Sequence, residues 1–440
     1  MTSEVAVMNK EAVALAADSA VTFTDGTGQK IFTSASKIFT LSKYQPVGVM
    51  IYGNASFMGI PWESIIKIYR SRLGTDTFKK VTDYVDNFLA FLRGGDLLFS
   101  NYEEEQEEYL RRSVYWCFKS IRERIDESVS LELYRKREIE ESVLESITTQ
   151  IIKSEFDEWG EAEATPLAPT SFDMDLSKMY GNLILQAQSE VFEGVPLTEE
   201  SSKLLAGIAF SMLWRFPSRM YNPESTGVVV AGFGTDEVFP VLESYSVEGR
   251  IDDYLKHRRI EKDCTRIGGS MSAAVLPFAQ REMVDTFMAG VDPVFHLRIK
   301  GFVENLDNLY REIQLDMIYD PHDDFEGSSM HEIEDQRDIV IEIGEQLEQF
   351  LPSLSEHSQS NHIDPVISVV QGLPRDELAA MAESLINLTS FKRRVSMQAE
   401  TVGGPIDVAV ISKGDGFIWI KRKHYFEGDM NPQFFANYFR

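Results

Sequence analysis

The feature that most constrains this chain is a nearly continuous apolar run close to its start, from Ala12 to Ala17. Asp18 closes the run, and the alternating segment Val5-Ala6-Val7 precedes it across a polar break. Alternation followed by a short apolar run indicates a strand, a turn and a buried strand. Asp18 is therefore expected at the edge of a core, where a carboxylate requires partners.

A second strand pair is predicted at residues 37–41 and 47–52, joined by a turn that contains a proline. The second strand stops at Gly53-Asn54, after which a helix is expected over residues 55–73. Lys37 is the first residue of the first strand in this pair. The first fifty residues are thus expected to carry a buried acid, a buried base and the hydroxyl of Thr2 on adjacent strands.

Composition narrows the class of protein. A chain of 440 residues with 43% hydrophobic and 11% aromatic residues can bury a sizeable core. A net charge of −27 disfavours nucleic acid or an anionic membrane as a partner. Two cysteines allow no disulfide framework, and none of the seven histidines shows His-x-x-x-His spacing, so we expect no metal and no other cofactor. Without a signal peptide or a spanning segment, we expect a cytoplasmic protein.

The rest of the chain alternates between helical and strand-like stretches. Helices are expected at 77–92, 103–124, 131–152, 198–214, 271–289, 332–350 and 375–395. Further strands are expected at 227–234, 239–247, 406–411 and 417–420. The segment 352–361, rich in Ser, His, Gln and Asn, is expected to be loose, and the basic run 421–423 to be surface charge.

This pattern predicts a core with two insertions. The core comprises residues 1–95, 226–302 and 373–425. The insertions are a helical one at 96–225 and a second, partly loose helical one at 303–372, and residues 426–440 form a C-terminal tail. The order of the strand pairs and helices favours an α+β chain with two antiparallel sheets stacked between helix layers.

Two segments carry a resemblance to a known family. The start, Thr2-Ser3-Glu4-Val5-Ala6-Val7 with Val13 to Ser19 and Thr22, resembles mature proteasome beta subunits and their bacterial relatives, including the gap from Thr2 to Asp18. Gly403-Gly404-Pro405-Ile406-Asp407-Val408-Ala409-Val410-Ile411 is similar to the family's closing Gly-Gly-x-Ile-Asp-Val-Ala-Val hairpin. The resemblance implies an N-terminal nucleophile hydrolase fold, a four-layer αββα sandwich, here with two large helical insertions.

The resemblance also implies roles for the opening residues. Thr2, exposed as the N-terminus by removal of the initiator methionine, supplies the nucleophilic hydroxyl and, through its free α-amine, the base. Asp18 and Lys37 form the pair that places a positive charge beside the hydroxyl. Lys30 stands in a near copy of the Lys37 sequence, but its separation from Asp18 is too short.

For the substrate, the resemblance implies backbone binding at Thr22 and an oxyanion site at the strand end that leads to Gly53. Three residues before Gly53, where the family has a glycine, this chain has Met50, whose N–H is expected to serve instead.

A supporting serine is expected at Ser270, after Gly268-Gly269. The family's supporting Asp and Ser align with Ala399 and Val402 and are therefore missing.

Together these features predict a threonine-type peptidase that hydrolyses peptide bonds inside a self-assembled homo-oligomer of one or more stacked rings. Its partners would be a peptide or unfolded protein substrate and an ATP-driven unfoldase of the AAA+ class. Two alternatives stay open: an amidase of the same fold acting on a small molecule, and a catalytically inactive, proteasome-like structural subunit in which Asp18 and Lys37 only stabilise the fold.

Overall fold

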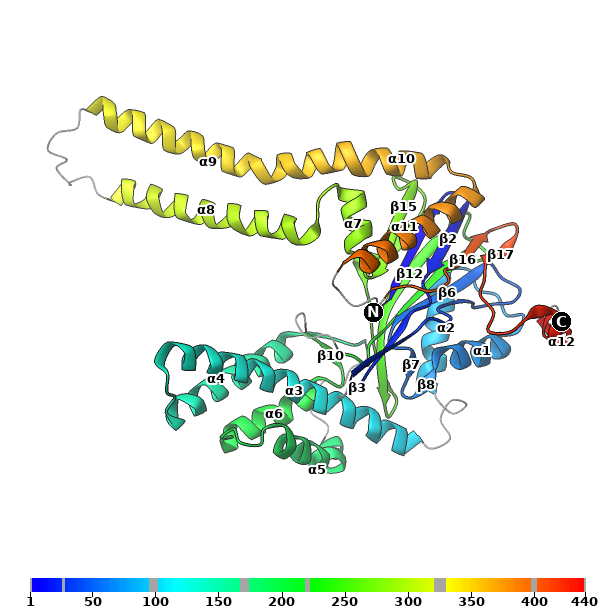
Figure 1. The fold of residues 1–440 in the computed structure, drawn as a ribbon, viewed down its shortest axis with the longest axis horizontal. Coiled ribbons are helices and arrows are strands. Elements are labelled where there is room, and N and C mark those ends of the chain that lie inside the picture. The colour runs from blue at the N-terminus through cyan, green and yellow to red at the C-terminus, as the bar shows by residue number, and fades with distance from the viewer. Residues whose placement is uncertain are drawn as a thin grey trace.

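The structure, a computed structural model, describes residues 2–25, 28–94, 102–166, 174–217, 222–319, 330–396 and 402–438. These residues contain two large antiparallel sheets (Figure 1). The first, in order across the sheet, is β15 (Ala273–Ala279), β1 (Ser3–Asn9), β2 (Ala12–Ala17), β16 (Asp407–Ser412) and β17 (Gly416–Lys421). The second is β13 (Tyr254–Arg259), β12 (Val241–Ile251), β11 (Thr226–Gly232), β6 (Val47–Gly53) and β5 (Ile38–Thr40), with β14 (Thr265–Arg266) on β12. The expected α+β class with antiparallel sheets is confirmed.

The two sheets pack face to face through an apolar cluster. Met8 and Leu15 of the first sheet meet Met50 and Val229 of the second, and all four are fully buried. Every residue of β1 and β2 is buried, because the opposite face of this sheet is covered as well. Burial on both faces explains why β2 is a continuous apolar run.

Helices cover the outer faces of both sheets. Val7 and Ala14 pack against Leu378 on one side, and Val230 packs against Phe88 on the other. The helices on the first sheet are α7 (Glu282–Ala289), α10 (Asp364–Gly372) and α11 (Arg375–Val395), and those on the second are α1 (Trp62–Leu73) and α2 (Val81–Gly94).

The sequence-based prediction was wrong at several boundaries. The break expected between the helices at 103–124 and 131–152 is absent, because one helix spans Tyr102–Lys136 and the next begins at Glu141. The helix expected at 271–289 begins as β15, which pairs with β1 along its whole length, and only α7 is helical. Pro277 is tolerated because β15 is an edge strand, where a missing N–H costs no ladder bond. The helix expected at 55–73 starts only at Trp62, after the two-stranded turn of β7 (Ser56–Phe57) and β8 (Ile60–Pro61).

The first helical insertion packs onto the second sheet. Tyr109 is fully buried, and its ring fills the space that a side chain at Gly249 of β12 would need. The insertion consists of α3 (Tyr102–Lys136), α4 (Glu141–Glu161), β9 (Glu163–Ala164), α5 (Met174–Val191), α6 (Glu199–Ser211) and β10 (Arg215–Phe216).

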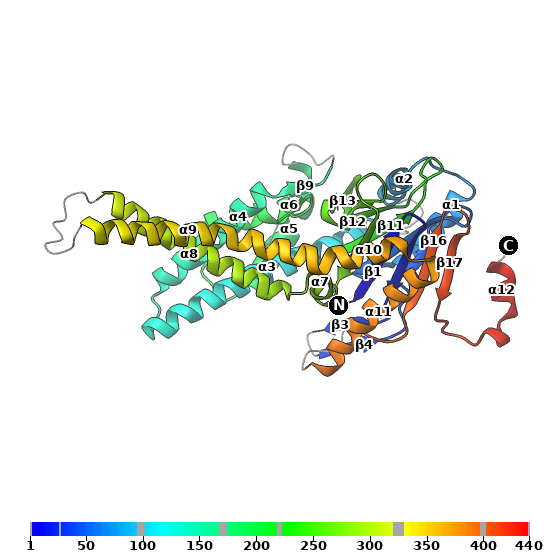
Figure 2. The ribbon, with the colours of Figure 1, turned by 90° about the horizontal axis from the view of Figure 1, so that it is seen from above.

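The second insertion is a long helical hairpin that projects away from the sheets (Figures 1 and 2). It consists of α8 (Pro293–Tyr319) and α9 (Met330–Ser358), followed by a π-helical turn, η2 (Gln359–Ile363). The expected loose segment at 352–361 is therefore helical. Tertiary contacts outweigh its polar composition, because Ser358 donates to the Ala289 carbonyl at 2.7 Å and His362 packs against Gly290.

The remaining elements are short. They are the hairpin of β3 (Val21–Asp25) and β4 (Gly28–Phe32), the 3-10 turns η1 (Glu261–Asp263) and η3 (Gly428–Met430), and the terminal helix α12 (Pro432–Tyr438). His424, Phe426, Phe434 and Phe435 form an aromatic cluster in the tail. In the described ranges, each helix lacks the combination of length and apolar character that a membrane crossing requires.

The inter-sheet cluster gives a stability prediction. Leu15→Ala removes a fully buried side chain from between two sheets that cannot close the gap, so the free energy of unfolding should fall by about 2–5 kcal/mol. Urea denaturation measures the change. Leu131→Ala, at a side chain 62% exposed, is the matched control and should leave the midpoint nearly unchanged.

Candidate active site

Thr2, Asp18 and Lys37 meet at one end of the stacked sheets. Thr2 immediately precedes β1, Asp18 immediately follows β2, and the two strands are antiparallel, so both residues lie at the same sheet end. Lys37 immediately precedes β5 of the second sheet. The three residues are at most 6% exposed.

Asp18 is the most highly coordinated group of the site. Its Oδ1 accepts hydrogen bonds from Lys37 Nζ at 2.5 Å and from the Ser3 N–H at 3.0 Å. Its Oδ2 accepts from the Ala20 N–H at 3.1 Å and the Gly403 N–H at 2.9 Å. Both oxygens are therefore fixed, and the charge is balanced by Lys37.

Glu4 is a further site residue that the sequence-based prediction missed. Thr2 Oγ1 donates a hydrogen bond to Glu4 Oε2 at 3.2 Å, and Glu4 Oε1 lies 3.6 Å from Lys37 Nζ. Alternate residues of a strand share one face, so the signal was the position of Glu4 two residues after Thr2. The site thus contains two carboxyl groups beside one lysine.

The protonation of Glu4 follows from its surroundings. Burial raises the pKa of Glu4 to about 8, Lys37 opposes the rise, and the negative charge of Asp18 adds to it. Glu4 therefore holds its proton over much of the neutral range, unlike an exposed glutamate.

A second buried ion pair lies next to the first. Lys423 donates to Asp407, at the start of β16, through both its side chain and, at 2.8 Å, its backbone N–H. Burial lowers the pKa of Lys423, and the positive charge of Lys37 contributes to the lowering. The expectation that Lys423 is a surface charge was wrong, because its side chain lies against Asp407, which is buried at the start of β16.

Of the residues predicted to bind substrate, Gly53 and Met50 direct their backbone N–H groups to opposite sides of β6. Ile51 donates its N–H to the Lys37 carbonyl at 2.9 Å, and the Gly53 N–H, two residues on, points to the same side of the strand. In the described part of the chain no strand pairs with Gly53 on that side. The Gly53 N–H is thus directed to the side of β6 on which Lys37 lies.

Met50 does not fit its expected role. It lies between Ile38 of β5 and Val229 of β11, and its N–H faces β11 because it alternates with that of Ile51. Its side chain fills the inter-sheet core. Thr22 lies in β3, opposite Ile31 of β4, in the hairpin that follows Asp18.

The structure also separates Ser270 from Thr2, which corrects the expectation of a supporting serine there. β15 pairs Ala279 with Ser3 and Ala273 with Asn9, so Ser270 lies beyond the far end of β1. That end is about 20 Å from Ser3, from the rise of a strand. Ser270 is exposed.

The residue that β15 brings to Thr2 is Gln280. Its N–H donates to the Thr2 carbonyl at 3.1 Å, and its side-chain oxygen accepts from Arg393 Nε of α11 at 2.8 Å. The sequence alone does not predict that Gln280 lies beside Thr2, because this position depends on the register between β1 and β15.

The closing glycine segment contributes through its backbone. Gly403 donates to Asp18 as described, its carbonyl accepts the Ser19 N–H at 3.2 Å, and Ser19 Oγ donates to the Pro405 carbonyl. Val402 is buried and apolar, and Ala399 lies outside the described residues. The resemblance at Gly403-Gly404-Pro405 therefore marks contacts that hold Asp18 in place.

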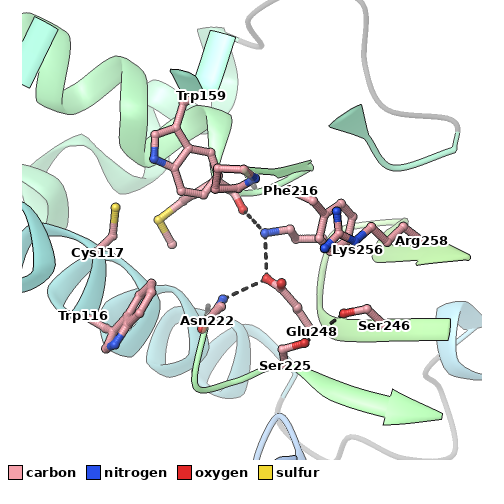
Figure 3. A pocket seen from close by; sticks show the side chains of 12 residues that line it. Trp116, Cys117, Trp159, Phe216, Asn222, Ser225, Ser246, Glu248, Lys256 and Arg258 are labelled. Carbon is pink, nitrogen blue, oxygen red and sulfur yellow. Dashed lines mark hydrogen bonds and ion pairs between the residues drawn. The ribbon is translucent and has the colours of Figure 1, made fainter. Parts of the chain in front are cut away.

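Another buried charge cluster lies at the opposite edge of the second sheet (Figure 3). Lys256 of β13 pairs with Glu248 of β12 at 2.6 Å, donates to the Met212 carbonyl at 2.8 Å and lies over the Phe216 ring at 4.7 Å. Asn222 also donates to Glu248, at 2.8 Å, beside a cavity of about 50 Å³. These charges satisfy one another and fasten the first insertion to the sheet.

In comparisons with known proteins, no protein-family model and no curated protein matches the chain. The class of site therefore follows from geometry. A hydroxyl lies beside a carboxyl group and a buried lysine–aspartate pair, at the end of two stacked sheets.

Loss of the Asp18 charge should destabilise the fold. Asp18→Asn leaves the buried Lys37 with Glu4, 3.6 Å away, as its ion-pair partner in the described part of the chain, so the free energy of unfolding should fall by about 3–5 kcal/mol. Urea denaturation tests this. The control is Glu63→Gln, which breaks an exposed pair with Lys67 and should cost less than about 1 kcal/mol.

Glu4 should make stability depend on pH. Its pKa is higher in the folded than in the unfolded protein, so the folded state binds more protons between about pH 4.5 and 8. The free energy of unfolding should therefore fall as pH rises through this window, by roughly 1 kcal/mol per pH unit relative to Glu4→Gln. Urea titrations of both proteins at several pH values measure the difference, and parallel curves would contradict the assignment.

Proposed function

We propose that this protein is a threonine-type peptidase of the N-terminal nucleophile class, with Thr2 as its nucleophile. The observation that carries the proposal is the buried Asp18–Lys37 pair at 2.5 Å, adjoining Thr2 through Ser3 and Glu4. A paired lysine placed beside a hydroxyl stabilises the negative charge that develops on its oxygen during attack.

The reaction proposed is acyl transfer from a peptide bond. Thr2 Oγ1 attacks the carbonyl carbon, and the proton passes to a base beside it. By the resemblance, that base is the α-amine of a Thr2 freed of the preceding residue. The Gly53 N–H points to the side where the oxyanion would form. Water then hydrolyses the ester on Thr2.

The fold supports the proposal. Helices, sheet, sheet and helices follow one another, as in the four-layer αββα sandwich of N-terminal nucleophile hydrolases. The β3–β4 hairpin that carries Thr22 follows Asp18 and Ser19 directly, where an extended peptide could lie.

Assembly into rings is part of the same proposal. On α8 the side chains of Phe295, Phe302 and Leu309 are 57%, 64% and 53% exposed, and their spacing of seven residues aligns them on one stripe. An exposed apolar stripe on a projecting hairpin favours contact between copies. Enclosed sites would take peptides or unfolded chains, supplied by an ATP-driven unfoldase.

Intact-mass spectrometry with a small β-lactone tests the proposal. We expect loss of the residue before Thr2 and one covalent adduct, mapped to Thr2 Oγ1. A small probe is suitable because Thr2 is 6% exposed.

Thr2→Ala is the matched control, because a small residue still permits removal of the initiator. It should form no adduct. A wild-type chain that keeps its initiator methionine and stays unlabelled would overturn the peptidase proposal. It would favour the alternative of a catalytically inactive structural subunit.

A further inference from the structure

Glu4 is a buried carboxyl group that the mechanism above leaves unused. Its Oε2 accepts from Thr2 Oγ1 at 3.2 Å, and among the described residues its Oε1 has no hydrogen-bond partner. Asp18, by contrast, binds backbone N–H groups through both oxygens. Asp18 therefore organises the backbone, whereas the Glu4 carboxyl group accepts a hydrogen bond from the nucleophile and lies 3.6 Å from Lys37 Nζ.

The position of Glu4 relative to Thr2 is fixed by the sheet. β1 is an interior strand, and Glu4 lies opposite Ala17 of β2 on one side and Phe278 of β15 on the other. Because neither neighbour allows β1 to slide, the carboxyl group and the Thr2 hydroxyl are held on the same face. This is the preorganisation that proton transfer requires.

Charged and titratable groups lie around Glu4 on several neighbouring elements. Asp18 lies at the end of β2, Lys37 before β5, and Tyr52 on β6, where burial raises the tyrosine's pKa and the negative charges of Asp263 and Glu4 add to the rise. The α-amine of a processed Thr2 would be the fourth such group. With Lys37 engaged at 2.5 Å by Asp18, Glu4 is the carboxyl group free to exchange a proton.

We propose that Glu4 is a catalytic residue, the general base that takes the proton from Thr2 Oγ1 during nucleophilic attack. The inference rests on the proposed function, since it assigns a role within acyl transfer at Thr2. It moves the task of proton acceptor from the α-amine to a side chain.

Each step balances. The reactive form has Glu4 ionised, which its pKa of about 8 places at the alkaline end of the neutral range. The Oγ1 proton then moves to Glu4 Oε2 as Oγ1 bonds to the carbonyl carbon and the carbonyl electrons move to its oxygen. The intermediate collapses, the C–N bond breaks, and Glu4 returns the proton to the leaving nitrogen. Water then attacks the ester carbon and gives one proton to Glu4; the bond from that carbon to Oγ1 breaks, and Glu4 passes the proton to Oγ1, which regenerates the Thr2 hydroxyl and the ionised Glu4. The net change is amide plus water to acid plus amine.

The test is the rate of β-lactone labelling at Thr2 as a function of pH, in the full-length wild-type protein and in Glu4→Gln. The glutamine keeps the shape of the side chain but accepts no proton. We expect the high-pH plateau of the labelling rate to fall about 100-fold or more. Glu4→Asp, which keeps the carboxyl group, should restore part of the lost rate.

Matched controls separate this role from a structural one. Glu248→Gln also removes a buried glutamate beside a lysine, but at the opposite edge of the second sheet, and should label like the wild type. Circular dichroism establishes that each variant is folded.

An unchanged plateau in folded Glu4→Gln, even with a shifted midpoint, would overturn the inference, because it would mean that Glu4 only tunes the α-amine. In that case labelling of Thr2 in the wild type would still support the peptidase. Absence of labelling in the wild type would instead remove the proposed function.

Discussion

The ion pair between Asp18 and Lys37 is the interaction on which the rest of this structure depends. Asp18 ends a strand of the first sheet and Lys37 opens a strand of the second, so one bond of 2.5 Å joins the two sheets at their common end. The same carboxylate binds the Ser3, Ala20 and Gly403 N–H groups. Four chain segments therefore converge on a single side chain, and Thr2 is positioned by that convergence.

The charges around this pair do not cancel. Glu4, Asp18 and Asp407 are three buried acids, and Lys37 and Lys423 are the two bases paired with them. Asp18 and Asp407 each hold a lysine at hydrogen-bond distance, whereas Glu4 lies 3.6 Å from Lys37. Burial raises the pKa of Glu4, and the negative charge of Asp18 adds to the rise, so this carboxyl group titrates closer to neutral pH than an exposed glutamate.

The sequence predicted the strands that carry the site, because β1, β2, β5 and β6 have strong local patterns. Asp18 and Lys37 follow from the same patterns, since each adjoins an apolar strand. Glu4 could have been found from its position two residues after Thr2, which places both side chains on one face of the strand. Gln280 and Lys423 could not, because their roles depend on the register between β1 and β15 and on the contact of Lys423 with Asp407. The prediction for Ser270 was wrong for a similar reason. Gly268-Gly269 indicates a turn, but the two glycines do not show at which end of the sheet this turn lies.

The hairpin of α8 and α9 has a mechanical consequence. α8 has 27 residues, which gives it a length of about 40 Å. Its base is connected through α7 to Gln280, whose N–H binds the Thr2 carbonyl. The other helix of the hairpin, α9, leads through η2 into α10, so both ends of the hairpin are attached to helices of the first sheet. A force applied to the hairpin would therefore reach the sheet that carries Thr2 through these two helices.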